Sequence, residues 1–512
     1  MRRLFIFAIA MFVLTVPYSL AGSSKKASAT TYYVSPSGSD AGSGSASAPW
    51  QTVSRVNQAA LQPGDTVLFE GGQTFTNANL MPAHSGTASD PIRFGSYGSG
   101  RARFTGSAND VWLPDGVHDL VFDNLDFTGS SNLFSSSGSG TGTYDITIQN
   151  SALHDTPAAA LNIANPQDHD WTVNNDSFTH TGDSAVFIWG NNITVSHSSF
   201  SDIGWNPAIS WGKHGIYDKG PNSTIAYNDF TNIPNGQAVS LRFHGAHVYG
   251  NTIHDTPYAI AFFDYDTAPA PQGTSYVYDN RLWNISGWGF YYANQADPQG
   301  HTPTVNFVVS SNTFSLNNAV EAVNLSEVPN PTTITLANNI FTGSYASAYR
   351  GCTTCTENNN DWYGGQRNVP SGRGDKHVNP ALSAAPQLAV PSTSPVHAAG
   401  TPVVRGLDYK AACDGGVLHY CGASPDQGSA VALSTAVTSR LASGSKTASS
   451  TAAEKSTSKN ASPAHAKTTK RAKTVTHVKV KSGTRFFTYK KNVKLRAGKT
   501  LHYAPGKGYY AA

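Results

Sequence analysis

Positive side chains are scarce in the middle of this 512-residue chain, and their spacing is the first feature that could do chemistry. Residues 104 to 349 contain 21 acidic residues but only four strong bases, Lys213, Lys219, Arg242 and Arg281. Lys219 and Arg242 each stand 11 residues before a large apolar residue that closes a similar short segment. Two cations at equivalent positions of neighbouring repeats repel each other unless an anion binds beside them. The spacing therefore predicts an anion-binding site.

A sequence repeat must position these cations. A β-branched or apolar run, a polar turn and one large apolar residue recur at a mean step near 27 residues. That period is too short for a four-stranded propeller blade and suits one coil of a parallel β-solenoid, in which each coil pairs with its neighbours. The closing residues are Phe127, Leu153, Phe178, Phe200, Phe230, Ile253, Leu282, Phe314 and Phe341.

Asparagines mark the turn of several repeats, two residues before the closing residue. Asn tolerates left-handed backbone geometry, and stacked Asn side chains can hydrogen-bond from one coil to the next. We therefore expect these residues to be structural rather than catalytic. They are Asn228, Asn251, Asn280, Asn312 and Asn339.

Side-chain alternation along the strands assigns the outer face of the solenoid. Val239 and Leu241 share the inward parity, which turns Arg242 outward, and the same count turns Tyr217 and Lys219 outward. Aromatic faces beside cations suit a sugar ring that carries a carboxylate or a sulfate. The predicted outer stripe consists of Trp189, Tyr217, Lys219, Arg242, Phe263 and Tyr291.

The chain resembles the right-handed parallel β-helix proteins of the pectate-lyase-like superfamily. Residues 32–72 resemble their opening segment, and residues 379–382 and 394–400 resemble their closing one. In such proteins the first segment, here Val53 to Leu61, caps the open end and prevents edge-to-edge association. The resemblance covers residues 30 to about 425 and implies an all-β, right-handed parallel β-helix. It leaves the function open, because this fold carries lyases, hydrolases, epimerases, esterases and adhesins.

Residues 214–253 also resemble the active-site stretch of polysaccharide lyase family 6, which includes alginate lyases and chondroitinase B. Lys219 falls on the catalytic base of that family, and Arg242 falls on its arginine. The resemblance implies cleavage of an acidic polysaccharide by β-elimination. Lys219 would remove the C5 proton of a uronate, while Arg242 binds the carboxylate and assists the departing oxygen.

The stretch departs from the family pattern in the charges around the base. His214 stands where the family has a calcium-ligating glutamate, and Phe243 is inserted before His244. Calcium is therefore left open, and Lys213 or His214 would have to neutralise the carboxylate.

The remaining expected site residues fall into two groups. Asp264 and Asp266 are the nearby outward acids that could hold a cation such as Ca²⁺. We expect substrate to contact Trp189, Lys213, His214, Tyr217, His244, Phe263 and Tyr291.

Two other functions stay open beside the lyase. Asp264, Asp266 and Glu321 could form the paired carboxylates of a polygalacturonase-like glycosidase, so a glycoside hydrolase or an epimerase on the same groove is one alternative. A non-catalytic carbohydrate-binding or cell-surface protein is the other. The residues favour a lyase over a hydrolase.

The N-terminus predicts export. Residues 1–21 read as a signal peptide, with Arg2 and Arg3 before an apolar stretch and a small-residue site ending at Ala21, and a short linker follows at 22–29. We expect a secreted, extracellular monomer, and no later stretch has the length of a membrane span.

The cysteines are expected to form disulfides, because export favours oxidation. The spacing of the second pair does not suit a four-cysteine zinc site, and the sequence leaves three connectivities open. The four residues are Cys352, Cys355, Cys413 and Cys421.

The C-terminal part differs in composition and charge from the rest. Residues 426–473 are rich in Ser, Thr, Ala and Lys and predict a flexible linker, and residues 474–512 predict a small basic β-rich tail. From Arg440 onward there are 17 Lys or Arg residues and one acid, whereas the preceding chain has 18 bases and 31 acids. Such a tail suits an anionic cell-surface polymer and could retain the protein there; we do not expect nucleic acid as a partner.

Overall fold

The computed structural model describes 15 segments of the chain. They are residues 28–106, 108–210, 212–242, 245–263, 273–293, 306–327, 333–351, 355–365, 367–404, 407–408, 425–429, 477–481, 484–488, 501–504 and 508–511. The expected signal peptide lies outside the described residues. Two compact units are distinguished, Met1–Lys446 and Thr447–Ala512.

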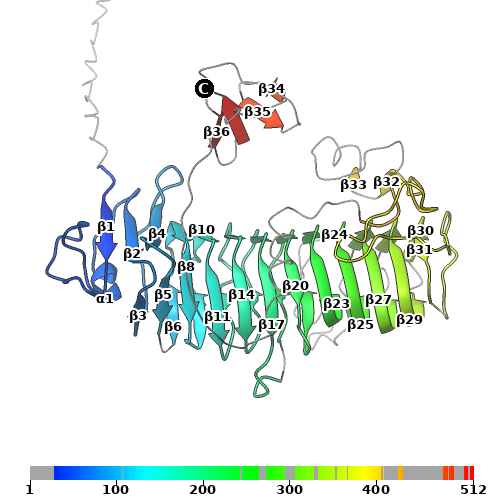
Figure 1. Ribbon diagram of the computed structural model, residues 1–512, viewed down its shortest axis with the longest axis horizontal. Coiled ribbons are helices and arrows are strands. Elements are labelled where there is room, and N and C mark those ends of the chain that lie inside the picture. The colour runs from blue at the N-terminus through cyan, green and yellow to red at the C-terminus, as the bar shows by residue number, and fades with distance from the viewer. Residues whose placement is uncertain are drawn as a thin grey trace, which may run out of the picture. The chain divides into compact units, whose positions relative to one another are not determined.

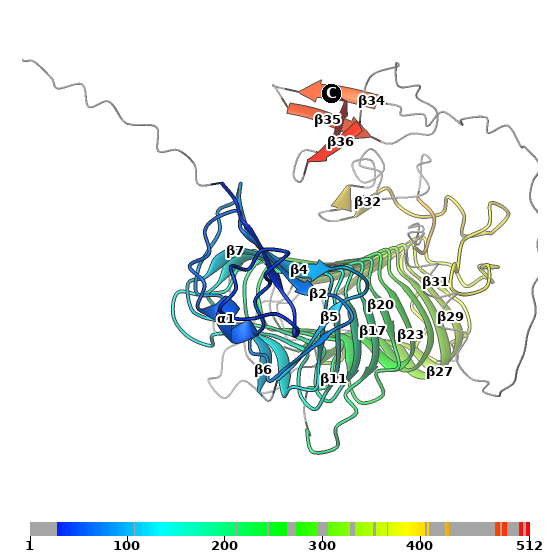
Figure 2. The ribbon, with the colours of Figure 1, turned by 60° about the vertical axis from the view of Figure 1, so that its left-hand side comes forward.

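The first unit is a parallel β-helix, in which short strands stack coil upon coil (Figures 1 and 2). One wall is a sheet of 13 strands, each paired in parallel with the next coil. Its strands are β1 (Thr31–Val34), β2 (Thr66–Glu70), β4 (Ile92–Tyr97), β7 (His118–Asp123), β10 (Tyr144–Gln149), β13 (Thr172–Asn174), β16 (Thr194–Ser196), β19 (Thr224–Ala226), β22 (His247–Tyr249), β24 (Thr274–Tyr278), β26 (Asn306–Ser310), β28 (Thr333–Ala337) and β30 (Cys355–Asn358).

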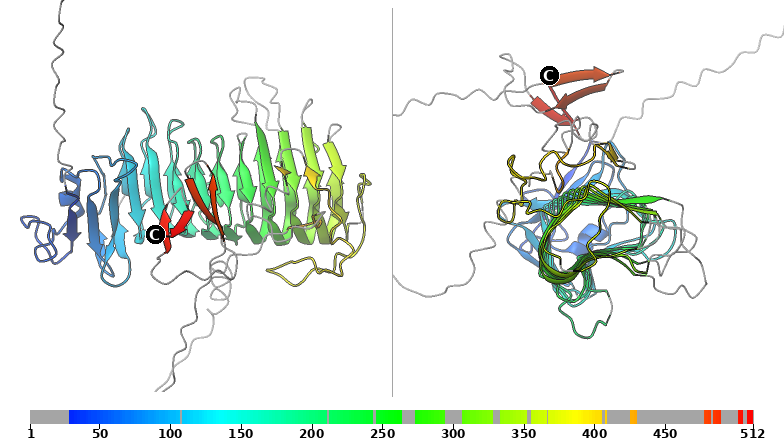
Figure 3. Two further views of the ribbon diagram at one scale, coloured as in Figure 1. Left: turned by 90° about the horizontal axis from the view of Figure 1, so that it is seen from above. Right: turned by 90° about the vertical axis from the view of Figure 1, so that its right-hand side faces the viewer.

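The rest of each coil contributes to a bent sheet of 18 strands, seen down the coil axis in Figure 3. The strands are β3 (Thr74–Thr76), β5 (Ala102–Thr105), β6 (Asn109–Leu113), β8 (Leu125–Thr128), β9 (Asn132–Ser136), β11 (Ala152–Thr156), β12 (Leu161–Ile163), β14 (Ser177–Thr181), β15 (Val186–Ile188), β17 (Ser199–Ile203), β18 (Ile216–Asp218), β20 (Asp229–Thr231), β21 (Gln237–Leu241), β23 (Thr252–Phe263), β25 (Arg281–Ala293), β27 (Thr313–Asn324), β29 (Ile340–Arg350) and β31 (Asp361–Trp362). A two-stranded antiparallel pair, β32 (Val403–Val404) and β33 (Leu407–Asp408), follows.

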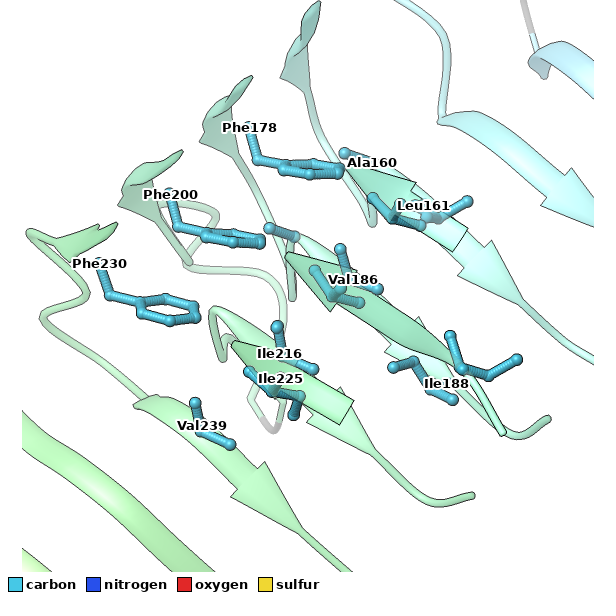
Figure 4. Packing of buried hydrophobic residues seen from close by; sticks show 14 of the residues in the cluster. Ala160, Leu161, Phe178, Val186, Ile188, Phe200, Ile216, Ile225, Phe230 and Val239 are labelled. Carbon is cyan, nitrogen blue, oxygen red and sulfur yellow. The ribbon is translucent and has the colours of Figure 1, made fainter. Parts of the chain in front are cut away.

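The predicted repeat is confirmed residue by residue. Each closing residue pairs in register with the next one, from Phe127 through Phe341 to Trp362, and all are buried. Figure 4 shows Phe178, Phe200 and Phe230 stacked inside the solenoid. Their ring centroids lie 4.8 Å and 4.5 Å apart. This aromatic column forms one side of the hydrophobic core.

The predicted asparagines form a buried ladder. The Asn280 amide donates to Asn312 Oδ1 and to Val248 O, both at 2.9 Å, and its Oδ1 accepts from the Asn251 amide at 2.9 Å. The same contacts continue to Asn360. The ladder satisfies backbone and side-chain polar groups that water cannot reach.

The expectation that these asparagines take the left-handed conformation is wrong. That conformation belongs to the residue before each of them, as at Tyr227 (φ 59°), Asp279 (φ 54°) and Asn338 (φ 59°). The chain turns at that residue, and the following Asn is then free to point inward and bridge coils.

A short helix covers the N-terminal end of the coils, where the sequence predicts a cap (Figure 2). Helix α1 (Val53–Asn57) begins after Thr52, whose side chain accepts from the Arg55 N–H. Val53 and Val56 are buried in the core. The apolar side chains of the first coils are thereby shielded from water.

Residues 425–429 are buried against the last coils, although composition assigns all but the first to the linker. The Gly428 N–H donates to Asn338 O at 2.6 Å, and the Ser429 N–H donates to Thr313 Oγ1 at 2.8 Å. The packed chain therefore extends at least to Ser429.

Cys355 is disulfide-bonded, and because the other cysteines lie outside the described residues the connectivity stays a prediction.

The second unit contains two antiparallel hairpins. Strand β34 (His477–Lys481) pairs with β35 (Thr484–Thr488), and β36 (Leu501–Ala504) pairs with β37 (Gly508–Ala511). Strands lie where the sequence predicts a β-rich tail; its expected binding role stays a prediction.

Removing one rung of the ladder should destabilise the solenoid. We expect Asn280→Ala to lower the free energy of unfolding by about 3 kcal/mol, because several buried partners lose their hydrogen bonds at once. Chemical denaturation followed by circular dichroism measures the change. Asn317→Ala, which removes an exposed Asn–Asn contact, is the matched control and should cost less than about 1 kcal/mol. Equal effects of the two variants would contradict a stabilising role for the buried ladder.

Candidate functional site

The strand register places Lys219 and Arg242 on neighbouring coils. Strands β18 and β21 pair in parallel with Asp218 opposite Leu241, so the next residues, Lys219 and Arg242, lie opposite each other. The Arg242 N–H donates to Asp218 O at 2.8 Å, and the Lys219 N–H donates to Ile188 O at 2.7 Å. The stacking that the 11-residue spacing predicts is therefore present.

The Lys219 ammonium lies among three aromatic rings. Its Nζ is 4.4 Å from the ring centroid of Trp189, 5.1 Å from that of Tyr217 and 5.8 Å from that of Phe187. Such rings attract a cation through the negative potential of their faces. Lys219 itself is half-buried, so part of the side chain reaches the surface.

Arg242 is more enclosed than its outward parity suggests. Its Cζ lies 4.0 Å from the Phe263 ring centroid and 4.7 Å from that of Tyr217. Its Nη1 donates to Ser240 Oγ (2.8 Å) and Leu241 O (3.2 Å), and its Nη2 donates to the Tyr217 hydroxyl (3.4 Å). Only 5% of the residue is exposed. Arg242 is therefore placed to hold Tyr217 and to supply positive potential, not to contact a ligand.

We call this set the cation–aromatic strip. Register and ring contacts join its members across four consecutive coils. The strip consists of Phe187, Trp189, Tyr217, Lys219, Arg242 and Phe263. Phe187 is outward by the same parity, but the sequence-predicted stripe omits it.

His214 is a neutral side chain in this structure. It is buried, and the Gln237 N–H donates to its Nδ1 at 3.1 Å, so the ring proton resides on Nε2. Burial, with a smaller contribution from Arg242, lowers the pKa of His214 to about 3. The expectation that His214 could neutralise a carboxylate is therefore wrong. Lys213, whose N–H donates to Asp183 Oδ1, precedes β18 and lies at the opposite end of that strand from Lys219.

Asp218 is a buried carboxyl group beneath the strip. Its Oδ1 accepts from the Gly220 N–H at 3.0 Å and from Ser223 Oγ at 3.1 Å, which fixes the turn that carries Lys219. Burial raises the pKa of Asp218 to about 7. Side-chain alternation along β18 already points Asp218 inward, which is an unusual direction for an ionisable side chain. That inward parity is the sequence signal that could have identified Asp218.

A second aromatic group continues the outer face over the following coils. Trp288 and Tyr291 have ring centroids 4.7 Å apart, and Tyr258 lies 5.4 Å from Trp288. Tyr291 also lies 5.6 Å from Phe263 and accepts a short hydrogen bond from the Gln237 amide. We call Tyr258, Trp288 and Tyr291 the tyrosine–tryptophan cluster. Phe263 and Tyr291 thus connect it to the strip.

Of the acidic residues that the sequence offers as paired carboxylates, Asp264, Asp266 and Glu321, the structure describes only Glu321. His244, Asp264 and Asp266 lie outside the described residues. Glu321 is buried and forms an ion pair with Arg350 at 2.6 Å. Among the residues that the structure does describe, no group of three or more His, Cys, Asp or Glu is arranged to hold a metal ion.

None of the described helices has the length and apolar character needed to span a membrane.

Comparison with known proteins confirms the right-handed parallel β-helix. Residues 132–297 match a family model described as a right handed beta helix region. No curated protein matches the chain in sequence.

Several solved structures are similar over much of the chain. Pectate lyase Pel9A is 16% identical, covering 78% of this chain and 96% of its own, with a TM-score of 0.38. An alginate lyase from Paenibacillus sp. str. FPU-7 is 14% identical, covering 68% and 98%, with a TM-score of 0.32. The catalytic domain of a GH87 alpha-1,3-glucanase in complex with nigerose is 11% identical, covering 64% and 66%, with a TM-score of 0.46. At these identities and TM-scores, their activities carry no weight for this chain.

The Asp218 carboxyl should make stability depend on pH. Its pKa is raised from an ordinary value near 3.8, so between pH 4 and 7 the folded chain keeps a proton that the unfolded chain has lost. Raising the pH therefore destabilises the wild type. Asp218→Asn has no such proton. As the pH rises over that range, its free energy of unfolding should increase relative to that of the wild type by up to about 1.4 kcal/mol per pH unit.

Urea unfolding of both proteins at several pH values measures this difference. Asp115→Asn, at an exposed aspartate, controls for the substitution itself. A wild-type-minus-variant difference that stays constant from pH 4 to 7 would contradict a raised pKa at Asp218.

Proposed function

We propose that the protein is a secreted lyase that binds an acidic, uronate-containing polysaccharide on the outer face of the bent sheet and cleaves it by β-elimination. The observation that carries the proposal is the Lys219 ammonium, half-buried against Trp189 and Tyr217 and one coil from the Arg242 guanidinium. A sugar ring can stack on exposed aromatic surface while its carboxylate meets a cation.

The charge distribution supports an anionic ligand at this place. Lys213, Lys219 and Arg242 are three of the four strong bases between residues 104 and 349, and all lie on two adjacent coils. Because Arg242 is enclosed, its charge cannot be neutralised by contact with a ligand, yet its potential still acts across the low-dielectric surface. The carboxylate would then meet Lys219 within the positive potential of Arg242.

In the proposed reaction, Lys219 first gives a proton to water, and the resulting amine takes the C5 proton of the uronate. The electron pair of that C–H bond forms the C4–C5 double bond, and the C4–O glycosidic bond breaks. The departing oxygen then takes a proton from water, because the enclosed Arg242 guanidinium cannot reach it. Arg242 is a positioning residue, since it hydrogen-bonds the hydroxyl of Tyr217, whose ring centroid lies 5.1 Å from Lys219 Nζ.

The alternatives predict different products from the same incubation. The purified secreted protein is mixed with alginate, polygalacturonate, hyaluronan and dermatan or chondroitin sulfate, and ultraviolet absorbance of unsaturated uronate is followed. New reducing ends without absorbance would indicate a glycoside hydrolase. Binding without either signal would indicate a non-catalytic carbohydrate-binding protein.

Lys219→Arg should separate binding from chemistry. Arginine keeps the positive charge beside Trp189, but it cannot lose its proton near neutral pH and so cannot act as a base. We expect elimination to fall at least about 1,000-fold in kcat while polysaccharide affinity changes less than about fivefold. Lys219→Met, which keeps the apolar stem and removes the charge, should lose both.

Lys376→Arg, on the last described coils, serves as the matched control. Elimination by Lys219→Arg at the wild-type rate would reject Lys219 as the base, whatever the substrate.

A further inference from the structure

We infer that the tyrosine–tryptophan cluster is a second binding subsite that takes an uncharged, hydroxyl- or amide-bearing sugar unit of the same polymer. This inference rests on the proposed function, because it assigns a ligand class to a continuation of the same face. It implies a heteropolysaccharide in which anionic and uncharged units alternate, rather than a polymer of uronate alone.

The cluster offers aromatic surface for such a unit. Tyr258 and Trp288 lie opposite each other on neighbouring strands, and both are half-buried, so part of each ring remains accessible. Tyr291 packs beneath them at 4.7 Å from Trp288 and is almost fully covered. Tyrosine and tryptophan combine an apolar face with a polar edge, which is the combination that a sugar ring presents in return.

Two buried polar atoms at the cluster point to a ligand. Within the described part of the chain, neither Gln237 Oε1 nor Trp288 Nε1 has a hydrogen-bond partner. Gln237 is only 8% exposed, and its amide nitrogen is already engaged by Tyr291. Leaving a buried donor and a buried acceptor unpaired costs about 1–3 kcal/mol for each group, so a ligand that pairs them gains affinity.

The types of these atoms select the chemistry of the ligand. Gln237 Oε1 only accepts and Trp288 Nε1 only donates, so the pair requires a ligand that does both. A sugar hydroxyl or acetamido group donates and accepts, so it can pair both atoms. A carboxylate can only accept, so a uronate would pair them through its hydroxyls and its carboxylate would face the Gln237 acceptor. Glu321, directly opposite Trp288 on the next coil, is ion-paired with Arg350 at 2.6 Å, so the described residues on this side of the cluster offer no unpaired cation to a carboxylate. The cluster therefore disfavours a uronate and favours an uncharged unit.

The distance between the two subsites fits one polymer. Lys219 follows β18 and Trp288 lies on β25, which are separated by three strand-to-strand steps through β21 and β23. At about 4.8 Å per step this is ~14 Å along the axis. The Trp288 row passes through Gln237, five residues from Arg242, which adds ~16 Å across the sheet, so the subsites lie ~20 Å apart, the length of about four sugar units. Phe263 and Tyr291 provide a continuous aromatic path between them.

The test compares polymers that differ in the alternating unit. Hyaluronan alternates a uronate with an N-acetylated hexosamine, whereas polygalacturonate consists of uronate alone. In the Lys219→Arg background, which stops cleavage, titration calorimetry should give at least tenfold tighter binding of hyaluronan oligosaccharides. Trp288→Ala should remove that preference by weakening hyaluronan binding about tenfold and leaving polygalacturonate binding unchanged.

Two further variants make the result specific. Trp283→Ala removes a half-buried tryptophan from the same strand, one that stacks on His254 away from the cluster, and should leave both affinities unchanged. Trp288→Phe keeps an aromatic ring and removes the Nε1 donor, so it should preserve the fold and weaken hyaluronan binding. It provides the test if Trp288→Ala does not fold.

The possible failures are distinguishable. Equal affinity for both polymers, together with no effect of the Trp288 variants, overturns the second subsite and leaves the proposed function intact. Absence of binding to any acidic polymer overturns the proposed function, and the subsite with it.

Discussion

The hydrogen-bond ladder between successive coils is the constraint on which every other feature depends. Each strand must pair in register with the coil before and after it, at a spacing of about 4.8 Å. A slip of one residue would turn every inward side chain outward, and the buried Phe178–Phe200–Phe230 column would be lost. The asparagine ladder reinforces the same register at the turn. Each outward residue therefore lies directly beside the equivalent residues of the neighbouring coils. This is why Lys219 and Arg242, 23 residues apart in the sequence, lie next to each other.

The ladder also explains why the body is acidic while its outer strip is cationic. Many of the acids are turn residues with left-handed backbone, a conformation that Asp tolerates better than most side chains. Several are partnered there, as Asp255 is by His254 at 2.6 Å and Asp202 is by His180 at 2.6 Å. These positions are Asp119, Asp145, Asp155, Asp170, Asp202, Asp255 and Asp279. A third of the acids between residues 104 and 349 thus serve the turns of the coils, and Lys219 is the base of the strip that stays accessible to a ligand.

Counting from the closing residues predicted the fold, the core column and the pairing of Lys219 with Arg242. The same count could not find Trp288, because β23 and β25 contain register shifts after Thr256 and between Trp283 and Trp288. An irregularity of one residue breaks the parity on which faces are assigned. The burial of Arg242 could not be predicted either, because it depends on how Phe263 and Tyr217 pack around the guanidinium. Side-chain alternation predicts only whether a residue points inward or outward.

The two stacked cations differ in what they can do, and the difference follows from their chemistry. A guanidinium is planar and weakly hydrated, so Arg242 can be enclosed between two rings while its nitrogens bond Ser240 and Tyr217. An ammonium is compact and strongly hydrated, and Lys219, whose Nζ lies over the Trp189 ring, accordingly stays only half-buried. Lys219 and Arg242 occupy equivalent positions on neighbouring coils, but they differ in their exposure to water. The enclosed Arg242 shapes the site. The half-buried Lys219 can contact the ligand and exchange a proton with it.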